Sequence, residues 1–160
     1  MSTGDPFRDF DFLFGEWHIQ HRRLRDPFNL KSDWVEFSST ASARPILGGG
    51  GNLDETTGTL ADGTTFNGMS LRLFDPVGAR WRIWWASSLL PGVLDDPVSG
   101  TFDGPIGTFT GTLAYPAGSV VGRFRWDVRD LDHPVWTQDF SRDGGASFDP
   151  VNWVMTFRRP

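Results

Sequence analysis

Turn-forming residue pairs recur at short intervals along this chain and leave little room for helices. Asp26-Pro27, Asp62-Gly63, Asp75-Pro76 and Pro91-Gly92 favour chain reversals, because proline presets a turn φ and glycine tolerates positive φ. Many of the segments between such pairs alternate apolar and polar residues, which is the period of a half-buried β-strand. The sequence therefore predicts an all-β chain of short consecutive strands.

About ten strands are predicted between the turns. They span 16–25, 31–43, 46–57, 64–74, 79–89, 97–102, 106–113, 119–129, 135–141 and 152–158. Short links favour antiparallel neighbours, because parallel pairing needs a crossover of about a dozen residues or more. We expect one domain over residues 1–160, built as a roughly ten-stranded antiparallel up-and-down β-barrel.

Two segments depart from the strand pattern. Residues 6–14 are predicted to form one short N-terminal helix, which Asp5 caps, Pro6 begins and Gly15 ends. The glycine run 48–51 lacks the Gly-Lys-Ser/Thr ending of a phosphate-binding loop and is followed by no predicted helix. We expect a sharply bent strand or a bulge there.

Composition narrows the classes of partner. The 160 residues contain no cysteine, which excludes disulfides and thiol catalysis, and the net charge of −5 argues against a nucleic-acid partner. No apolar run approaches the roughly 18 residues of a membrane span, and segment 1–11 lacks the apolar core of a secretory signal. We expect a cytoplasmic protein without a membrane partner. Whether two copies form a homodimer stays open at the level of sequence.

The eight tryptophans and 14 phenylalanines indicate an aromatic interior. Side chains alternate between the two faces of a strand, so parity predicts which of them point inward. Strand 31–43 is ambiguous, since either Val35 and Phe37 or Trp34 and Glu36 could be the inner set. The predicted ligand-lining residues are Trp17, His21, Arg23, Glu36, Asn67, Met69, Trp81, Trp85, Phe124, Trp126, Trp136, Gln138, Phe140, Trp153 and Met155.

Three inward polar side chains, His21, Arg23 and Gln138, predict a cavity. A solid core would rarely hold them, because an unpaired buried charge costs several kcal/mol, whereas a water- or ligand-filled space accepts them. We expect binding of a small, largely apolar or aromatic molecule with an acidic or carbonyl group. Arg23 would clamp the acid and Gln138 would fix its orientation.

Two other functions stay open at the level of sequence. A cofactor-free isomerase, cyclase or dehydratase could use His21 as acid–base and Arg23 to stabilise an anion. A protein-interaction module would expose Trp34 and Trp84 as one patch. No metal site is expected, because His18 and His21 lie on opposite strand faces and His133 lies in a loop.

Several motifs together resemble a known family. They are residues 12–17 (Phe-Leu-Phe-Gly-Glu-Trp), 21–24, 46–49, 74–76, 81–85 (Trp-Arg-Ile-Trp-Trp), 140–145 and 152–153. Across nearly the whole chain they resemble bacterial proteins of unknown function in the calycin superfamily (DUF1579-like). The resemblance implies a calycin-like barrel with a central cavity and no particular activity.

Two more calycin resemblances bear on single residues. Gly15-Glu16-Trp17 is similar to the Gly-x-Trp start of lipocalins, whose tryptophan closes the bottom of the barrel. In nitrobindin-like barrels one histidine holds haem iron, and here only His21 has the inward phase. No haem motif surrounds His21, so no cofactor is expected and haem is kept as an alternative.

Overall fold

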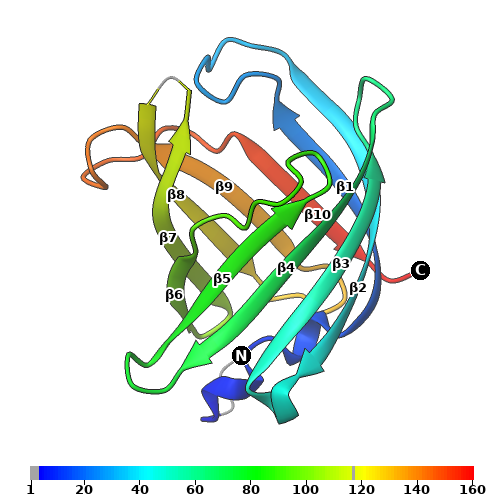
Figure 1. Ribbon diagram of the computed structural model, residues 1–160, viewed down its shortest axis with the longest axis vertical. Coiled ribbons are helices and arrows are strands. Elements are labelled where there is room, and N and C mark those ends of the chain that lie inside the picture. Colours follow the sequence, from blue (N-terminus) through cyan, green and yellow to red (C-terminus); the bar gives the residue numbers. More distant parts are fainter. Residues whose placement is uncertain (1–3, 117) are drawn as a thin grey trace.

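The chain forms a single closed β-barrel in the computed structural model, which describes residues 4–116 and 118–160. Each strand pairs antiparallel with the next along the chain, and β1 pairs with β10 to close the sheet (Figure 1). The predicted ten-stranded up-and-down barrel is confirmed. Residues 1–3 and 117 of the predicted domain lie outside the described residues.

The strands follow the predicted segments closely, with two exceptions. Their bounds are β1 Gly15–Leu24, β2 Trp34–Ile46, β3 Gly51–Thr59, β4 Thr65–Asp75, β5 Arg80–Ser87, β6 Val98–Asp103, β7 Ile106–Tyr115, β8 Gly118–Asp127, β9 Val135–Ser141 and β10 Trp153–Arg158. β2 begins later than predicted, because residues 25–33 form a hydrogen-bonded loop in which Arg25 N–H donates to the Asp33 carbonyl at 2.8 Å. β3 also begins later.

The late start of β3 comes from a turn in the glycine run. Leu47–Gly49 is a single 3-10 turn, and its backbone has φ of 52° at Leu47, 64° at Gly48 and 97° at Gly49. A positive φ takes these residues out of the extended conformation of a strand. Glycine adopts a positive φ without a steric cost. The predicted bent strand or bulge is therefore wrong here: a turn joins β2 to β3.

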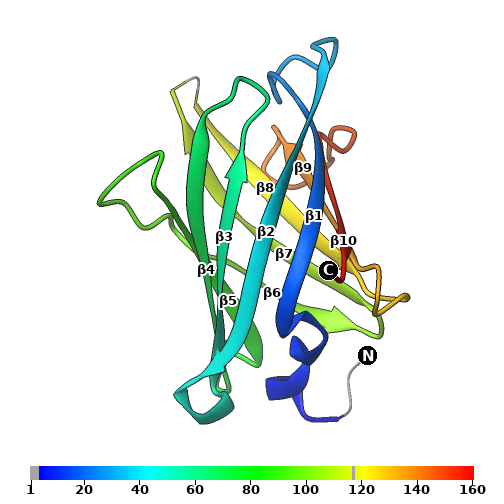
Figure 2. The ribbon, with the colours of Figure 1, turned by 90° about the vertical axis from the view of Figure 1, so that its right-hand side faces the viewer.

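The predicted short N-terminal helix is present, as two successive 3-10 turns. Pro6–Arg8 begins where the Asp5 carboxylate accepts a hydrogen bond from Phe7 N–H at 3.1 Å, and Asp11–Leu13 follows. The break between them lets Asp9 and Phe10 point into the barrel, where both are buried. The turns lie across one end of the barrel (Figure 2). No helix in the described part of the chain has the length and hydropathy to cross a membrane.

Aromatic rings fill the end that the N-terminal turns close. Phe10 meets Trp81 edge-on at 4.9 Å between ring centroids, and the indole N–H of Trp17 donates to the Leu13 carbonyl at 2.7 Å. Fully burying an aromatic side chain of this size stabilises a fold by about 1.5–3 kcal/mol. The buried members of this closed-end core are Phe10, Leu13, Trp17, Ile19, Ala43, Trp81, Val98, Phe109, Trp126, Val128 and Phe157.

The inner face of β4 carries a charged side chain, Arg72. Register sets Arg72 opposite Asn52, and the buried Arg72 guanidinium pairs with the Asp54 carboxylate at 2.6 Å. Arg72 also donates to Asn52 Oδ1 at 3.1 Å. Because inner and outer residues alternate, Asn67 and Met69 point outward, and the predicted inward placement of both is wrong.

The ambiguity of β2 is resolved by its register with β1. Phe37 lies opposite the inward His21 and is buried, whereas Glu36 lies opposite the outward Arg22 and is exposed. Glu36 therefore faces solvent, and its predicted place in the barrel interior is wrong. The aromatic ring belongs inside because burying phenylalanine is favourable, while a lone buried carboxylate is costly.

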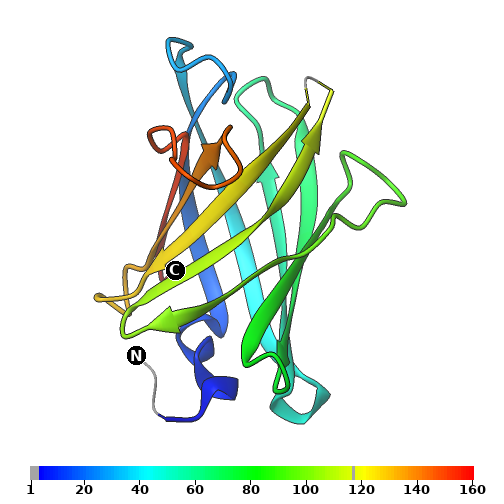
Figure 3. The same ribbon diagram turned by 90° about the vertical axis from the view of Figure 1, so that its left-hand side faces the viewer.

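The barrel is least regular between β5 and β6. Only Trp81, Arg82 and Ile83 of β5 pair with β6, and the 88–97 connection projects from the wall (Figure 3). Asp95 N–H of this connection donates to the Trp85 carbonyl of β5 at 2.9 Å. Beyond Ile83, the neighbour of β5 on this side is thus the 88–97 loop rather than strand β6.

The buried Arg72–Asp54 pair yields a stability prediction. Arg72→Leu should lower the free energy of unfolding by about 3–5 kcal/mol, because it leaves the Asp54 carboxylate buried and unpaired. The matched variant Arg82→Leu breaks the half-exposed Arg82–Asp75 pair and should cost no more than about 1 kcal/mol. Urea titration of both variants measures the difference; equal losses would contradict the prediction.

Candidate functional site

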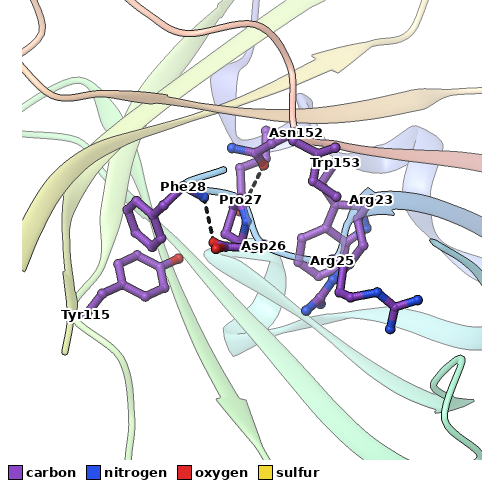
Figure 4. A pocket seen from close by; sticks show the side chains of 10 residues that line it. Arg23, Arg25, Asp26, Pro27, Phe28, Tyr115, Asn152 and Trp153 are labelled. Atoms are coloured by element: carbon purple, nitrogen blue, oxygen red, sulfur yellow. Dashed lines mark hydrogen bonds between the residues drawn. The ribbon is translucent and has the colours of Figure 1, made fainter. Parts of the chain in front are cut away.

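A cavity of about 360 Å³ opens at the end of the barrel opposite the N-terminal turns. Figure 4 shows the side chains that line it. Its volume falls in the range of small-molecule sites. The wall combines strand residues from β1, β7, β9 and β10 with the loop that follows β1. The lining residues are Arg23, Leu24, Arg25, Asp26, Pro27, Phe28, Tyr115, Gln138, Asn152 and Trp153.

The structure distributes the predicted ligand-lining residues over several places. Arg23, Gln138 and Trp153 line the cavity. The remaining residues do not. Trp17, Trp81 and Trp126 belong to the closed-end core; Phe140 is buried beside the cavity; Trp85, Phe124, Trp136 and Met155 occupy inner strand positions; His21 is buried nearby; Glu36, Asn67 and Met69 lie outside.

The loop after β1 contributes residues that sequence reasoning treated only as a turn. Phe28 folds back over the open end, with its ring centroid 4.9 Å from that of Tyr115 and 5.5 Å from that of Phe140. Arg142 donates to the Phe28 carbonyl at 2.9 Å and holds the loop in place. The signals available in the sequence were weak: one phenylalanine within a polar turn, and the single tyrosine.

Arg23 places a positive charge in the cavity wall. Its guanidinium lies 4.8 Å from the ring centroid of Trp153, and none of the ion pairs among the described residues involves it. Burial lowers the pKa of Arg23 from its ordinary value, and nearby Tyr115 opposes that change. Contact with an indole face compensates for only part of the lost hydration. The site therefore offers a cation without a counter-ion.

An amide pair forms the floor of the cavity beside Arg23. Gln138 donates to Asn152 Oδ1 at 2.9 Å, and both side chains are buried. Asn152 Nδ2 has no hydrogen-bond partner within residues 4–116 and 118–160. A buried donor left unpaired costs about 1–3 kcal/mol, so such a group is commonly found where a ligand or water supplies the acceptor.

His21 is locked in one tautomer beneath the cavity. The indole N–H of Trp153 donates to Nδ1 at 3.2 Å, and an indole nitrogen cannot accept. Nε2 therefore carries the proton and donates to Ser39 Oγ at 2.7 Å. With both ring nitrogens engaged and 3% of its surface exposed, His21 does not project into the cavity as predicted.

The same contacts bear on haem and on metals. A haem iron would need a free ring nitrogen on His21, and neither nitrogen is free. The residues do not fit that group. Across the described ranges, no three acidic or histidine side chains are close enough to hold a metal ion.

The two outward tryptophans do not form one patch. Trp34 begins β2 and lies under the Arg22 guanidinium at 4.4 Å, while Trp84 lies opposite Leu71 on β4. Across the sheet, Leu71 on β4 lies opposite Leu53 on β3, and Leu53 lies opposite Arg44 on β2. Arg44 is ten residues from Trp34, which corresponds to about 33 Å along the strand. A shared interaction surface at these two residues is absent.

Comparison with known proteins supports the fold alone. No protein-family model and no curated protein matches the chain. A similar structure is that of an S-type phycobiliprotein lyase from Guillardia theta, with a TM-score of 0.61, 12% identity, and coverage of 94% of this chain and 90% of that chain. Another, EF1p2_mFAP2b bound to DFHBI, has a TM-score of 0.51, 12% identity, and coverage of 98% and 100%. Membership of the DUF1579-like family and of the calycins stays a prediction.

Stability should depend on pH through His21. Burial, followed by the charge of Arg23, lowers the pKa of His21 from 6.5 to about 4 in the folded chain. As the pH falls below about 6.5 the unfolded chain takes up this proton and the folded chain does not. The contribution is thus complete above pH 6.5 and is lost progressively toward pH 4, by about 3 kcal/mol in total.

Urea unfolding of the wild type and of His21→Gln at pH 7.5, 6.0 and 4.5 measures this effect. The variant should lose part of the decline in stability with falling pH, whereas exposed His133→Gln should keep it. A wild-type decline that persists unchanged in His21→Gln would show that another group is responsible.

Proposed function

We propose that this protein binds a small, largely aromatic anion at the open end of its barrel. The observation that carries the proposal is the Arg23 guanidinium, half-buried in a cavity whose wall includes Phe28, Tyr115 and Trp153, and outside every ion pair of the described residues. Asp26 also lines this cavity, where its carboxylate accepts a hydrogen bond from Phe28 N–H. A ligand anion would supply the missing counter-charge. Pairing an anion with Arg23 costs less desolvation than pairing it with an exposed arginine, because Arg23 is already partly removed from water.

The chemistry of the wall favours an acid over a neutral carbonyl. A carboxylate or sulfonate can accept two parallel N–H bonds from one guanidinium, and such charge-assisted pairs are stronger than a single bond to a carbonyl. Phe28, Tyr115 and Trp153 provide apolar surface for an aromatic body. Burial raises the pKa of Tyr115, so its neutral hydroxyl is available as a further donor.

Binding is favoured over acid–base catalysis because His21 has no free nitrogen. Trp153 and Ser39 engage both ring positions, and the lowered pKa leaves the imidazole neutral at physiological pH. General acid–base work requires a group that reaches the substrate and exchanges a proton with it. The comparison adds support for binding, since one barrel of similar fold is bound to DFHBI.

Arg23→Gln should selectively weaken the binding of an anionic aromatic probe. We expect its affinity for 8-anilinonaphthalene-1-sulfonate to fall roughly tenfold or more, in line with the loss of a charge-assisted hydrogen bond. The affinity for the uncharged N-phenyl-1-naphthylamine should change much less. Titration by probe fluorescence measures both.

Arg22→Gln is the matched control, because Arg22 neighbours Arg23 on β1 but faces outward and is exposed. It should bind both probes as the wild type does. Equal losses for the two probes in Arg23→Gln, or equal effects of the two substitutions, would overturn the role given to Arg23.

A further inference from the structure

The inner face of the barrel is not filled solid below the cavity. Met155 and Trp136 lie one inner position beyond Trp153 and Gln138 on β10 and β9, which is about 7 Å farther along each strand. Both point inward and both are half-buried, as is Phe124, which lies opposite Gln138 on β8. Side chains on the inside of a closed barrel can keep accessible surface only if space remains in front of them.

Trp153, Trp136 and Phe124 form a continuous aromatic track that begins at the cavity wall and crosses from β10 to β8. The Trp136 ring meets Trp153 edge-on at 5.4 Å between centroids, and Phe124 lies 5.1 Å from Trp136 with the ring planes tilted by 38°. The track begins beside Arg23, whose guanidinium covers the Trp153 ring. Charge and aromatic surface therefore follow one another along a single path.

The opposite wall and the lower limit of this path are also defined. Ser70 and Trp85, paired across β4 and β5, face inward and are half-buried. A Cβ at Gly68 would lie 2.1 Å from Cη2 of Trp85, so this glycine lets the indole lie close against β4 and leaves room in front of it. The path ends at Trp126 and Phe109, which are 3% and 0% exposed.

We infer that the ligand is an elongated aromatic acid of at least two linked rings. This inference rests on the proposed function and adds a shape to it. The acid contacts Arg23 at the mouth, the first ring lies along Trp153, and the next ring extends past Met155 to Trp136 and Phe124. A single-ring acid would fill the mouth and leave the aromatic track unused.

Two isomers of one aromatic acid test the effect of ligand shape on affinity, because their charge and atomic composition are the same. Biphenyl-4-carboxylate is straight, whereas biphenyl-2-carboxylate has the same atoms and charge with the second ring folded beside the acid. We expect calorimetric titration of the full chain to give at least tenfold tighter binding of the straight isomer. Equal affinities for the two isomers would overturn the inferred shape and leave the proposed anion binding in place.

Met155→Trp fills the path below the mouth without altering Arg23. It should abolish the preference for the straight isomer, while binding of the folded isomer changes less than threefold. Val154→Trp is the matched control, because Val154 is the preceding residue and faces outward opposite Arg22. A preference that survives in Met155→Trp would overturn the inference.

Phe124→Leu tests the same path with little risk to folding. Removing the ring should weaken the straight isomer several-fold and leave the folded isomer unchanged, and an equal loss for both would contradict the track. If the wild type binds neither isomer nor the anionic naphthalene probe, the proposed function itself fails. That outcome differs from one in which both isomers bind alike.

Discussion

Closure of the sheet by the β1–β10 pairing is the constraint on which the rest of this structure depends. A closed barrel has no free strand edge, and it forces the inner side chains of every strand to share one enclosed volume. How completely those side chains fill the volume then differs from one end of the barrel to the other. A ring lost from the closed end would open space that the strands cannot collapse to fill.

The two ends of the barrel solve this packing problem differently. At the closed end, Phe10 from the N-terminal turns inserts between Trp81 and Phe102 and completes an apolar core. At the open end, residues 25–28 of the loop after β1 lie over the mouth, with Phe28 against Tyr115, and leave the cavity below them. The difference in filling explains why the cavity lies at one end of the barrel.

Three inward side chains that can carry a positive charge, the buried Arg72 and His21 and the half-buried Arg23, are each stabilised by different contacts. Arg72 has a carboxylate partner, and His21 is held neutral by two hydrogen bonds. Arg23 has an aromatic face and no counter-ion within the described residues. A fold keeps an incompletely compensated charge at a cost in stability, and such charges concentrate where a ligand completes them.

Much of the architecture could be predicted from local patterns. Turn pairs marked the strand ends, and alternation placed Trp17, Trp81 and Trp153 on inner faces, because both signals depend on neighbours in the chain. The facing of β4 could not be predicted, since its outer face is also apolar and only the distant Asp54 makes an inward Arg72 acceptable. The same limit hid Phe28 and Tyr115, which meet only after folding.

The sequence by itself thus determined an all-β chain of consecutive antiparallel strands with an aromatic inner face and an arginine among the rings. Only the tertiary structure decided which end stays open, which polar groups have partners, and that His21 is engaged while Arg23 is not. The physical reason is that periodicity is a property of one strand, whereas pairing of charges and filling of volume require residues from several strands in register.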